Sequence, residues 1–272
     1  VGVVAEEGRR VGKHDLLRDL PVVGRFEIEI RREVHAVELR DHTLGAVFLL
    51  QLRQHLRAQV FVVQNLLVDL TVKGFAEETS RESPAPGGGS VSAYMGALGA
   101  SLATMVANLS SHKPGWDDQW DEFAAVAEEG MALQERLLHL VDEDTEAFNR
   151  IMAAFGMPKN TPEEKAARSE AIQTATLFAT EVPLETMKAS YEVFAVCRKM
   201  VEKGNPNSVS DAGVGALAAR AAVLGAGMNV KINAGSLKDR EKAEALIAEA
   251  NELIEKANCE EAEITKLVEE KL

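Results

Sequence analysis

Apolar residues recur every three or four positions from about residue 66 to the end of the chain, which is the spacing of amphipathic α-helices. The longest such run, over 117–155, carries a stripe of Leu137, Val141, Phe148, Met152 and Phe155. The pattern predicts helices over 66–80, 90–111, 117–155, 161–180, 185–203, 208–233 and 237–272. We therefore expect an all-α fold, a multi-helix bundle of roughly seven helices.

Several residues mark where these helices begin and end. The prolines of the loop "SPAPGGG" (83–89) cannot continue a helix, so they end the first one. Ser90 is a natural N-cap for the next helix. Thr161 and Glu164 have the spacing of a capping box. Pro183 is expected to break the helix that contains it, or to restart it.

Two of the predicted helices are almost free of charge. Residues 91–109 carry none, and 212–230 carry only Arg220. Such a helix is either buried in a bundle or spans a membrane. Both segments are rich in Gly and Ala, and Asp211 and Arg220 would be costly in lipid. We therefore expect buried helices rather than membrane spans, with small residues that let neighbouring helices approach closely.

The first 66 residues differ from the rest. They carry ten basic and nine acidic side chains, whereas 67–272 carry twenty and thirty-four, so the charges are +1 and −14. The segment "RFEIEIRR" alternates as a half-exposed strand would, but a segment this short holds only a marginal core. We expect a domain boundary near residue 66 and a short, foreign N-terminal extension of uncertain structure.

The overall charge and the cysteines narrow the class of protein. A net charge of −13 argues against nonspecific nucleic-acid binding, which needs a basic face. Cys197 and Cys259 lie far apart and fit no zinc spacing, and Cys197 is expected to be a buried thiol. No charged-then-apolar leader is visible at the N-terminus. A cytoplasmic setting is the expectation.

Five blocks of the sequence resemble a known family. They are "DLTVKGFAEETSRESPAPGGGSVSAYMGALGASLATMVANLS", "DEDTEAFNRIM", "EVPLETM", "GNPNSVSDAGVGALAARAA" and "GAGMNVKIN". In this order they are similar to the cyclodeaminase domain of formiminotransferase-cyclodeaminase, over about 67–272. The resemblance implies a bundle of the cyclodeaminase type that forms a homodimer or higher homo-oligomer. Residues 1–66 do not resemble the formiminotransferase domain and are too short for it.

The resemblance also implies a reaction in folate one-carbon metabolism and histidine degradation. In 5-formiminotetrahydrofolate, N10 attacks the formimino carbon, and the tetrahedral intermediate expels ammonia to give 5,10-methenyltetrahydrofolate. One carboxyl group of raised pKa can act in turn as base and acid, and no metal or redox cofactor is needed. Two alternatives stay open: a methenyltetrahydrofolate cyclohydrolase, and a helical module that binds folate or is structural, without turnover.

Asp144 is the first candidate for that carboxyl group. It continues the apolar stripe between Val141 and Phe148, where desolvation raises the pKa of an acid. The neighbouring acids Asp142, Glu143 and Glu146 are expected to point to solvent. Spacing alone equally allows an exposed or lysine-paired acid, and the family block around Asp144 favours catalysis.

Asp211 is the second catalytic candidate. It also has capping-box spacing with Ser208, a structural role that could explain both residues.

The substrate contacts are predicted from loops and from polar residues in apolar helices. The glycine loop and the N-terminus of the helix behind it form a polar cradle for pterin carbonyls or a glutamate carboxylate. Neutral polar groups suit a pterin edge, and a basic spot is needed for the anionic folate tail, with one or several glutamates. Arg220 has an alternative role as an ion-pair partner, for Asp144 among others. The predicted substrate-binding residues are Gly87, Gly88, Gly89, Ser90, Asn108, Lys113, Asn205, Asn207, Ser210, Arg220 and Asn229.

Overall fold

A computed structural model describes residues 66–272, and the predicted extension lies outside them except for Leu66. Every regular element in the described range is helical, which confirms the all-α prediction. Three of these elements are short 3₁₀ turns, η1 (Leu67–Asp69), η2 (Asp117–Gln119) and η3 (Pro206–Ser208). The α-helices are α3 (Val72–Thr79), α4 (Gly88–Ser111), α5 (Trp120–Gly156), α6 (Pro162–Lys203), α7 (Val209–Ala234) and α8 (Arg240–Glu269).

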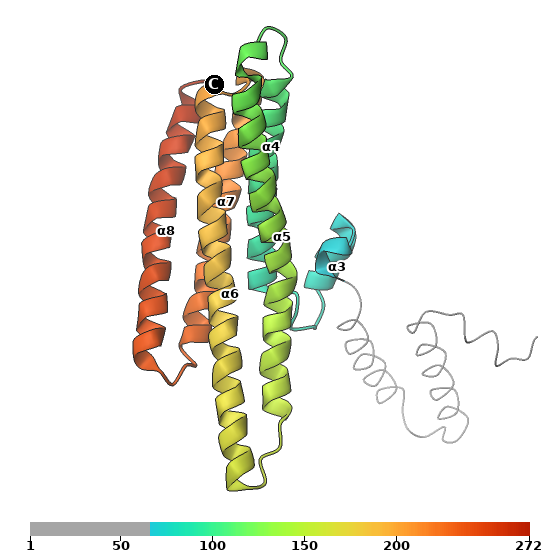
Figure 1. Ribbon diagram of the computed structural model, residues 1–272, viewed down its shortest axis with the longest axis vertical. Helices are drawn as coiled ribbons and strands as arrows, with labels where there is room; N and C mark the ends of the chain where they lie inside the picture. Colours follow the sequence, from blue (N-terminus) through green and yellow to red (C-terminus); the bar gives the residue numbers. More distant parts are fainter. Residues whose placement is uncertain (1–65) are drawn as a thin grey trace, which may run out of the picture. The chain divides into compact units, whose positions relative to one another are not determined.

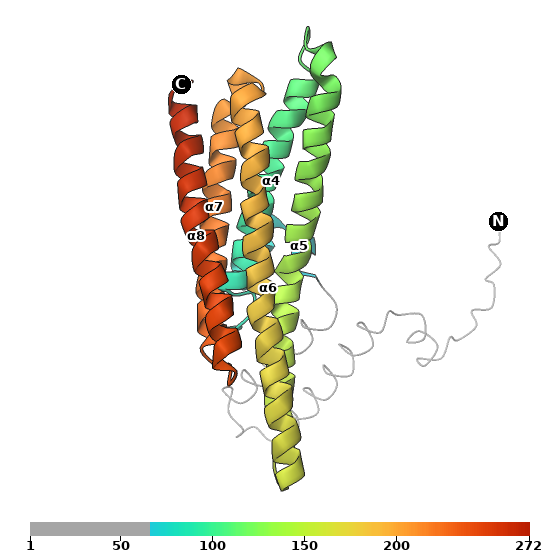
Figure 2. The same cartoon turned by 60° about the vertical axis from the view of Figure 1, so that its left-hand side comes forward.

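The five long helices, α4 to α8, run alongside one another as an up-and-down bundle (Figures 1 and 2). Helix α4 contacts α5, α6 and α7, and α8 packs against α6 and α7. The α5–α6 hairpin projects beyond the other helices at the end opposite the C-terminus (Figure 1). Because α5 loses neighbours there, Met152 and Phe155 are 53% and 51% exposed. The apolar stripe predicted for α5 is therefore buried only in its first part.

Small residues bring α4 and α7 together at backbone distance. A Cβ atom added to Gly99 would lie 2.8 Å from the carbonyl oxygen of Gly215, and one added to Gly225 would lie 2.4 Å from Ser92 Oγ. Larger side chains at these positions would push the helices apart. The close approach predicted from the small residues is thus found inside the bundle.

The prediction that Pro183 breaks its helix is wrong, because α6 runs through it without interruption. A proline has no N–H to donate to the carbonyl four residues earlier, here Ala179. The side chain of Asn233 on α7 donates to that carbonyl instead, with Nδ2 2.6 Å from the oxygen. The orphaned acceptor is therefore satisfied, and six α-helices are found in the described part instead of about seven.

The caps at the helix N-termini agree only in part with those predicted from the sequence. The Thr161–Glu164 capping box is present. Ser90, however, is not an N-cap: α4 begins at Gly88 with Gly87 as its cap, so Ser90 lies in the first turn. Ser208 caps α7 without a side-chain hydrogen bond, so no capping box joins it to Asp211.

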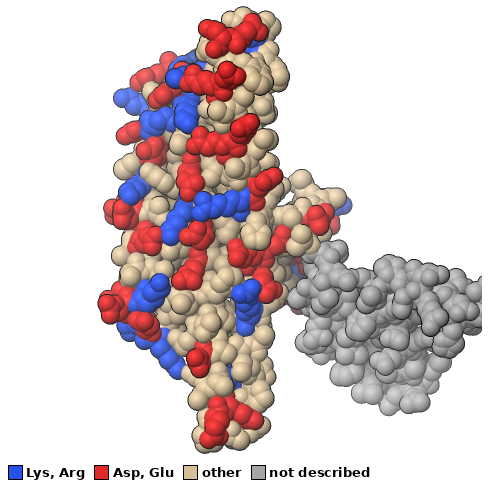
Figure 3. All heavy atoms as spheres, viewed as in Figure 1, with Lys and Arg blue, Asp and Glu red and all other residues tan. Residues whose placement is uncertain are grey.

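Helix α4 and the segment Pro206–Ala234 are long and apolar enough to cross a membrane by length and composition. In the structure, 61% and 50% of their apolar windows are buried inside the bundle. Part of the remainder is a set of exposed apolar residues on α4 and α7, which we call the α4–α7 face. By contrast, Lys, Arg, Asp and Glu cover much of the surface formed by α5, α6 and α8 (Figure 3). The α4–α7 face consists of Leu98, Met105, Leu109, Val214, Leu217, Met228 and Ile232, all exposed.

Candidate functional site

Asp144 lies on α5 against the first turn of α4. Its Oδ2 accepts two hydrogen bonds from Ser90, one from the backbone N–H at 2.9 Å and one from the hydroxyl at 3.0 Å. Ser90 is completely buried, and its Oγ lies 3.4 Å from Thr145 Oγ1. The first turn of α4 therefore fixes the orientation of this carboxyl group.

Glycine at position 89 is what allows the carboxyl group to come so close. A Cβ atom added to Gly89 would lie 2.0 Å from Asp144 Oδ1, far inside van der Waals contact. At Gly88 the added atom would lie 3.3 Å from Asn229 Nδ2 on α7. At Gly87 it would meet only the Pro84 carbonyl at 3.5 Å, an ordinary contact. Two of the three glycines are thus tied to close packing at Asp144 and Asn229.

The predicted ligand cradle is partly occupied by the protein itself. Asp144 takes the Ser90 N–H at the N-terminus of α4, where the helix dipole favours an anion. Within residues 66–272, the N–H groups of Gly88 and Gly89 have no acceptor. These two donors remain for a ligand beside Asp144.

Burial is the main influence on the charge of Asp144, and it raises the pKa of this carboxyl group above its ordinary value. The two hydrogen bonds from Ser90 stabilise the carboxylate and partly oppose the rise. No Lys or Arg within the described chain forms a salt bridge with Asp144. Asp144 is therefore the half-buried, unpaired acid that the sequence predicts, while its catalytic role stays a prediction.

The neighbouring acids behave less uniformly than predicted. Glu146 lies towards solvent beside Arg150, whereas Glu143, near His139, is only 31% exposed. Asp142 is also half-buried, and its Oδ1 accepts a hydrogen bond from the Leu67 N–H. Burial also raises the pKa of Asp142. This carboxyl group anchors η1 to α5, a contact that local periodicity cannot reveal.

The loop before α7 lies far from Asp144 in this chain. Asp211 and Asn229 are both on α7 and 18 residues apart, about 27 Å at 1.5 Å per residue. Asn229 adjoins Gly88, so it lies at the Asp144 end, with its Nδ2 donating to Gly225 O. Asp211 lies at the opposite end. Asn205, Asn207 and Ser210 lie there too.

The remaining predicted substrate-binding residues, Asn108, Lys113 and Arg220, contact parts of the protein other than Asp144. Asn108 lines a cavity of about 400 Å³ between α4 and α5, near the C-terminus of α4. Lys113 follows that helix, with Nζ 3.8 Å from the centre of the Trp116 ring. Arg220 donates from Nε to Asn258 Oδ1 at 2.8 Å and lies 3.5 Å from Glu261. Arg220 is thus held by α8 and does not pair with Asp144.

Sequence reasoning missed Thr145, whose hydroxyl extends the contact between Asp144 and Ser90. A threonine beside an acid on a helix gives no distinctive signal, so only the fold reveals it. In the range that the structure describes, no group of three or more His, Cys, Asp or Glu side chains could hold a metal ion.

The fold and the site define an all-α, up-and-down bundle with a half-buried carboxyl group at the start of α4, and comparisons with known proteins identify the family. Residues 71–252 match the family model of formiminotransferase-cyclodeaminase, and the chain belongs to this family. A solved structure of formiminotetrahydrofolate cyclodeaminase from Thermotoga maritima superimposes with a TM-score of 0.65 at 27% identity. The match covers 74% of this chain and 96% of that one.

Two curated relatives carry different activities in their names. Methenyltetrahydrofolate cyclohydrolase from Methylorubrum extorquens is 39% identical over 202 residues, which is 74% of this chain and 97% of that protein. Formimidoyltransferase-cyclodeaminase from Mus musculus is 35% identical over 173 residues, which is 64% of this chain and 32% of that protein. The match to the mouse protein thus spans about a third of its length. The family is a folate cyclodeaminase and cyclohydrolase family.

Proposed function

We propose that the chain is a formimidoyltetrahydrofolate cyclodeaminase, an ammonia-lyase in which Asp144 transfers the protons. The observation that carries this proposal is the single half-buried carboxyl group held by Ser90 against the start of α4. Its raised pKa lies closer to neutrality than that of an exposed aspartate, which suits a group that must be base and then acid.

The chemistry uses Asp144 twice. N10 of 5-formiminotetrahydrofolate attacks the formimino carbon, a C–N bond forms, and the proton released from N10 passes to the carboxylate. The carboxyl group then returns this proton to the amino group of the tetrahedral intermediate. The bond from carbon to that nitrogen breaks, ammonia leaves, and 5,10-methenyltetrahydrofolate remains.

The surrounding residues supply orientation. Ser90 holds Oδ2 of Asp144, while Oδ1 has no hydrogen bond within residues 66–272 and is the oxygen available for proton transfer. The N–H groups of Gly88 and Gly89, with the side chain of Asn229 beside them, offer hydrogen bonds to a pterin edge. Asn229 is thus the residue of the "GAGMNVKIN" block that we assign to substrate binding.

A second candidate is methenyltetrahydrofolate cyclohydrolase, favoured by the 39% identity to the Methylorubrum extorquens enzyme over almost its full length. In this reaction Asp144 accepts a proton from the water that attacks the methenyl carbon. It then protonates N5 as the bond between N5 and this carbon breaks, and the remaining hydroxyl proton passes to solvent as the 10-formyl compound forms. Both reactions need one proton-shuttling carboxyl group beside a pterin.

We further propose that the molecule is a homodimer joined through the α4–α7 face. Helix α4 carries no charged residue and α7 only Asp211, Arg220 and Lys231, so two copies of a strongly acidic protein can meet here with little like-charge repulsion. A cytoplasmic setting and a role in histidine degradation stay predictions.

Purified full-length protein given 5-formiminotetrahydrofolate tests the proposal, with ammonia and methenyl absorbance followed together. We expect both to appear in equal amounts, and an Asp144→Asn variant to lose both. Hydrolysis of methenyltetrahydrofolate without ammonia release from the formimino compound would establish the cyclohydrolase instead. Folate binding with neither activity would show a module without turnover.

A further inference from the structure

Seven serine and threonine hydroxyls on α4 and α6 donate to the carbonyl oxygen four residues earlier in the same helix, a common bond for these side chains. Ser90 on α4 and Thr145 on α5 form no such bond within the described range, and their side-chain oxygens lie 3.4 Å apart. These two hydroxyls therefore join two helices at the place where Asp144 lies. The seven that serve their own helix belong to Ser92, Ser101, Thr104, Ser110, Thr176, Thr180 and Thr186.

The bond from Ser90 to Asp144 sets the direction of the contact with Thr145. A serine hydroxyl carries one proton, and Ser90 donates it to Asp144 Oδ2 at 3.0 Å. Towards Thr145, Ser90 Oγ can then only accept, so the Thr145 hydroxyl is the donor. Thr145 Oγ1 forms no other hydrogen bond within residues 66–272. The result is a chain of donors that runs from Thr145 through Ser90 to Asp144.

This chain makes the two oxygens of Asp144 unequal. Oδ2 accepts from both the N–H and the hydroxyl of Ser90, whereas Oδ1 accepts from no residue of the described range. Two donors on one oxygen favour the negative charge there, so the proton of the neutral carboxyl group resides on Oδ1. Gly89 adjoins Oδ1 and has no side chain to cover it. Asp144 therefore exchanges its proton at a single oxygen as long as the Ser90 hydroxyl keeps its orientation.

Burial and hydrogen bonds, rather than neighbouring charges, act on Asp144. Burial raises its pKa, and the two bonds from Ser90 lower it. Helices α4 and α7 present only neutral groups here, and within residues 66–272 α6 brings no charged side chain into salt-bridge distance of Asp144. On α5 itself, the nearby acids contact groups other than Asp144. These acids are Asp142, Glu143 and Glu146.

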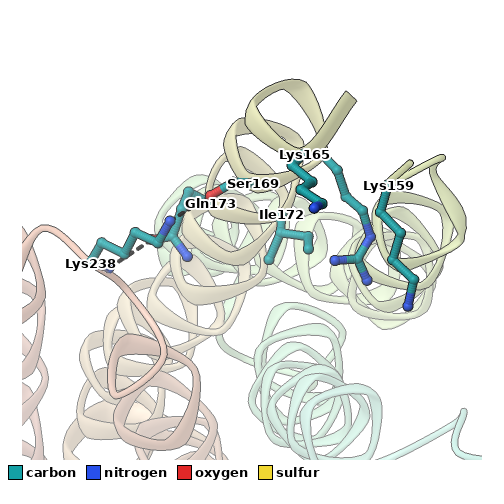
Figure 4. A pocket seen from close by; sticks show the side chains of 7 residues that line it. Lys159, Lys165, Ser169, Ile172, Gln173 and Lys238 are labelled. Carbon is teal, nitrogen blue, oxygen red and sulfur yellow. Dashed lines mark hydrogen bonds between the residues drawn. The ribbon is translucent and has the colours of Figure 1, made fainter. Parts of the chain in front are cut away.

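Positive charges gather around the α5–α6 hairpin instead. Lys159, Lys165, Arg168 and Lys238 line a cavity of about 280 Å³ there (Figure 4). In the part of the chain that the structure describes, none of the four forms a salt bridge with Asp144. The hydroxyl chain is thus the feature of these surroundings that can tune the acid.

We propose that Thr145 is a positioning residue for the proton transfer at Asp144: its hydroxyl holds that of Ser90 towards Oδ2 and so keeps Oδ1 free for the substrate. The proposal rests on the proposed function. At 3.4 Å the contact from Thr145 is a weak hydrogen bond, so its effect is smaller than that of Ser90. Thr145 acts through Ser90 and needs no contact with the substrate.

Kinetics of variants of the full-length protein test this role. We measure kcat across pH on 5-formiminotetrahydrofolate and on methenyltetrahydrofolate. Ser90→Ala removes a hydrogen bond to a charged group, so kcat should fall about tenfold or more. The acidic limb of the pH profile should move to higher pH, because the carboxylate loses a donor. Thr145→Val should act in the same direction, with kcat about threefold lower.

The double variant separates positioning from substrate contact. In the Ser90→Ala background, Thr145→Val should change neither kcat nor the pH profile, because Thr145 acts only through the lost hydroxyl. Thr145→Ser keeps a hydroxyl and should retain the wild-type profile. The control Thr265→Val removes another half-buried hydroxyl, which bonds Glu261 on α8, and it should leave kcat and the profile unchanged.

Two results would overturn the positioning role. One is a wild-type kcat and pH profile in Thr145→Val. The other is an equal loss from this substitution in both backgrounds, which would show that Thr145 contacts the substrate directly. Circular dichroism and thermal melts establish that each variant is folded, and Thr145→Ala takes the place of Thr145→Val if the latter is not.

Failure of the proposed function gives a different result, namely no turnover of either substrate by the wild type. The role of Thr145 is then decided by NMR of protein isotopically labelled at the aspartate side-chain carboxyl carbons. The Asp144 signal is assigned from its loss in Asp144→Asn. Ser90→Ala should raise the pKa of Asp144, and Thr145→Val should raise it only while Ser90 is present. An unchanged titration of Asp144 in Thr145→Val overturns the proposal.

Discussion

At the scale of single residues, Asp144 was predictable and its partner was not. Helical periodicity places Asp144 in line with the apolar stripe of α5, because the angle between successive side chains is fixed. Spacing alone equally allows an exposed acid, and the family block around Asp144 favoured the buried, catalytic one. Ser90 was misassigned as an N-cap, since a serine hydroxyl can accept from the helix or donate to another group. The acceptor it finds is 54 residues away, and no local pattern carries that information.

The Asp144→Asn variant separates catalysis from structure. It removes proton transfer while keeping the size of the side chain, so turnover should fall by about 10²–10⁴-fold. Folate binding and helicity should be retained. Steady-state kinetics and calorimetric binding on the same preparation check this, and wild-type turnover in a folded variant would remove Asp144 from the mechanism.

The raised pKa of Asp144 gives a prediction for stability as well. A carboxyl group whose pKa is higher in the folded state stabilises the fold at low pH, and this contribution is lost as pH rises through the folded pKa. Asp144→Asn should therefore have a Tm at or above that of the wild type at pH 7 to 8. The difference should move in favour of the wild type as pH falls towards the ordinary aspartate pKa. Thermal melts across pH, with Asp118→Asn as an exposed control, measure this dependence.

Gly89→Ala tests whether close packing holds the acid in place. The added methyl group would lie 2.0 Å from Asp144 Oδ1, so the carboxyl group must move away from Ser90. We expect turnover to fall at least tenfold and the free energy of unfolding to drop by about 1–3 kcal/mol. Gly87→Ala, which meets only an ordinary contact, should change stability by about 1 kcal/mol or less. Equal effects of the two substitutions would contradict this account.

At the scale of elements, α6 shows why the expectation that Pro183 breaks its helix was wrong. The expectation describes an isolated helix, in which the carbonyl four residues before the proline loses its donor. Here a side chain from α7 provides that donor, and the cost of the proline is removed by a tertiary contact. The capping box at Thr161 was predicted correctly because all of its atoms lie within one turn.

A double-mutant cycle between Asn233 and Pro183 measures this contact. Asn233→Ala leaves the Ala179 carbonyl without its donor and should cost about 1–3 kcal/mol in the free energy of unfolding. In a Pro183→Ala background the restored backbone N–H can bond that carbonyl, so the same substitution should cost much less. Urea unfolding of the four proteins gives the coupling, and additive effects would show that the carbonyl does not depend on Asn233.

At the scale of the whole molecule, the sequence predicted the family and the helical bundle but not which distant segments meet. Asp211 and Asn229 belong to one helix, and its length separates them by about 27 Å. Lys159, Lys165 and Lys238 come from three segments, and only the ends of the bundle bring them to one cavity. From the sequence, Arg220 could be a folate contact or an ion-pair partner, and in the fold it is held by α8.

The α4–α7 face leads to the last prediction. Leu217 lies in the middle of α7 and is 50% exposed, on the apolar α4–α7 face. In a homodimer joined through this face, Leu217→Asp would bury an unpaired carboxylate beside its copy from the second subunit, which is strongly unfavourable. We expect the wild type to be a dimer by light scattering and Leu217→Asp to be a monomer of unchanged helicity. The control Val72→Asp, on α3 and 77% exposed, should remain a dimer. A dimer that withstands Leu217→Asp would place the subunit contact on another surface, and a monomeric wild type would show that the α4–α7 face is not a contact between copies of this chain.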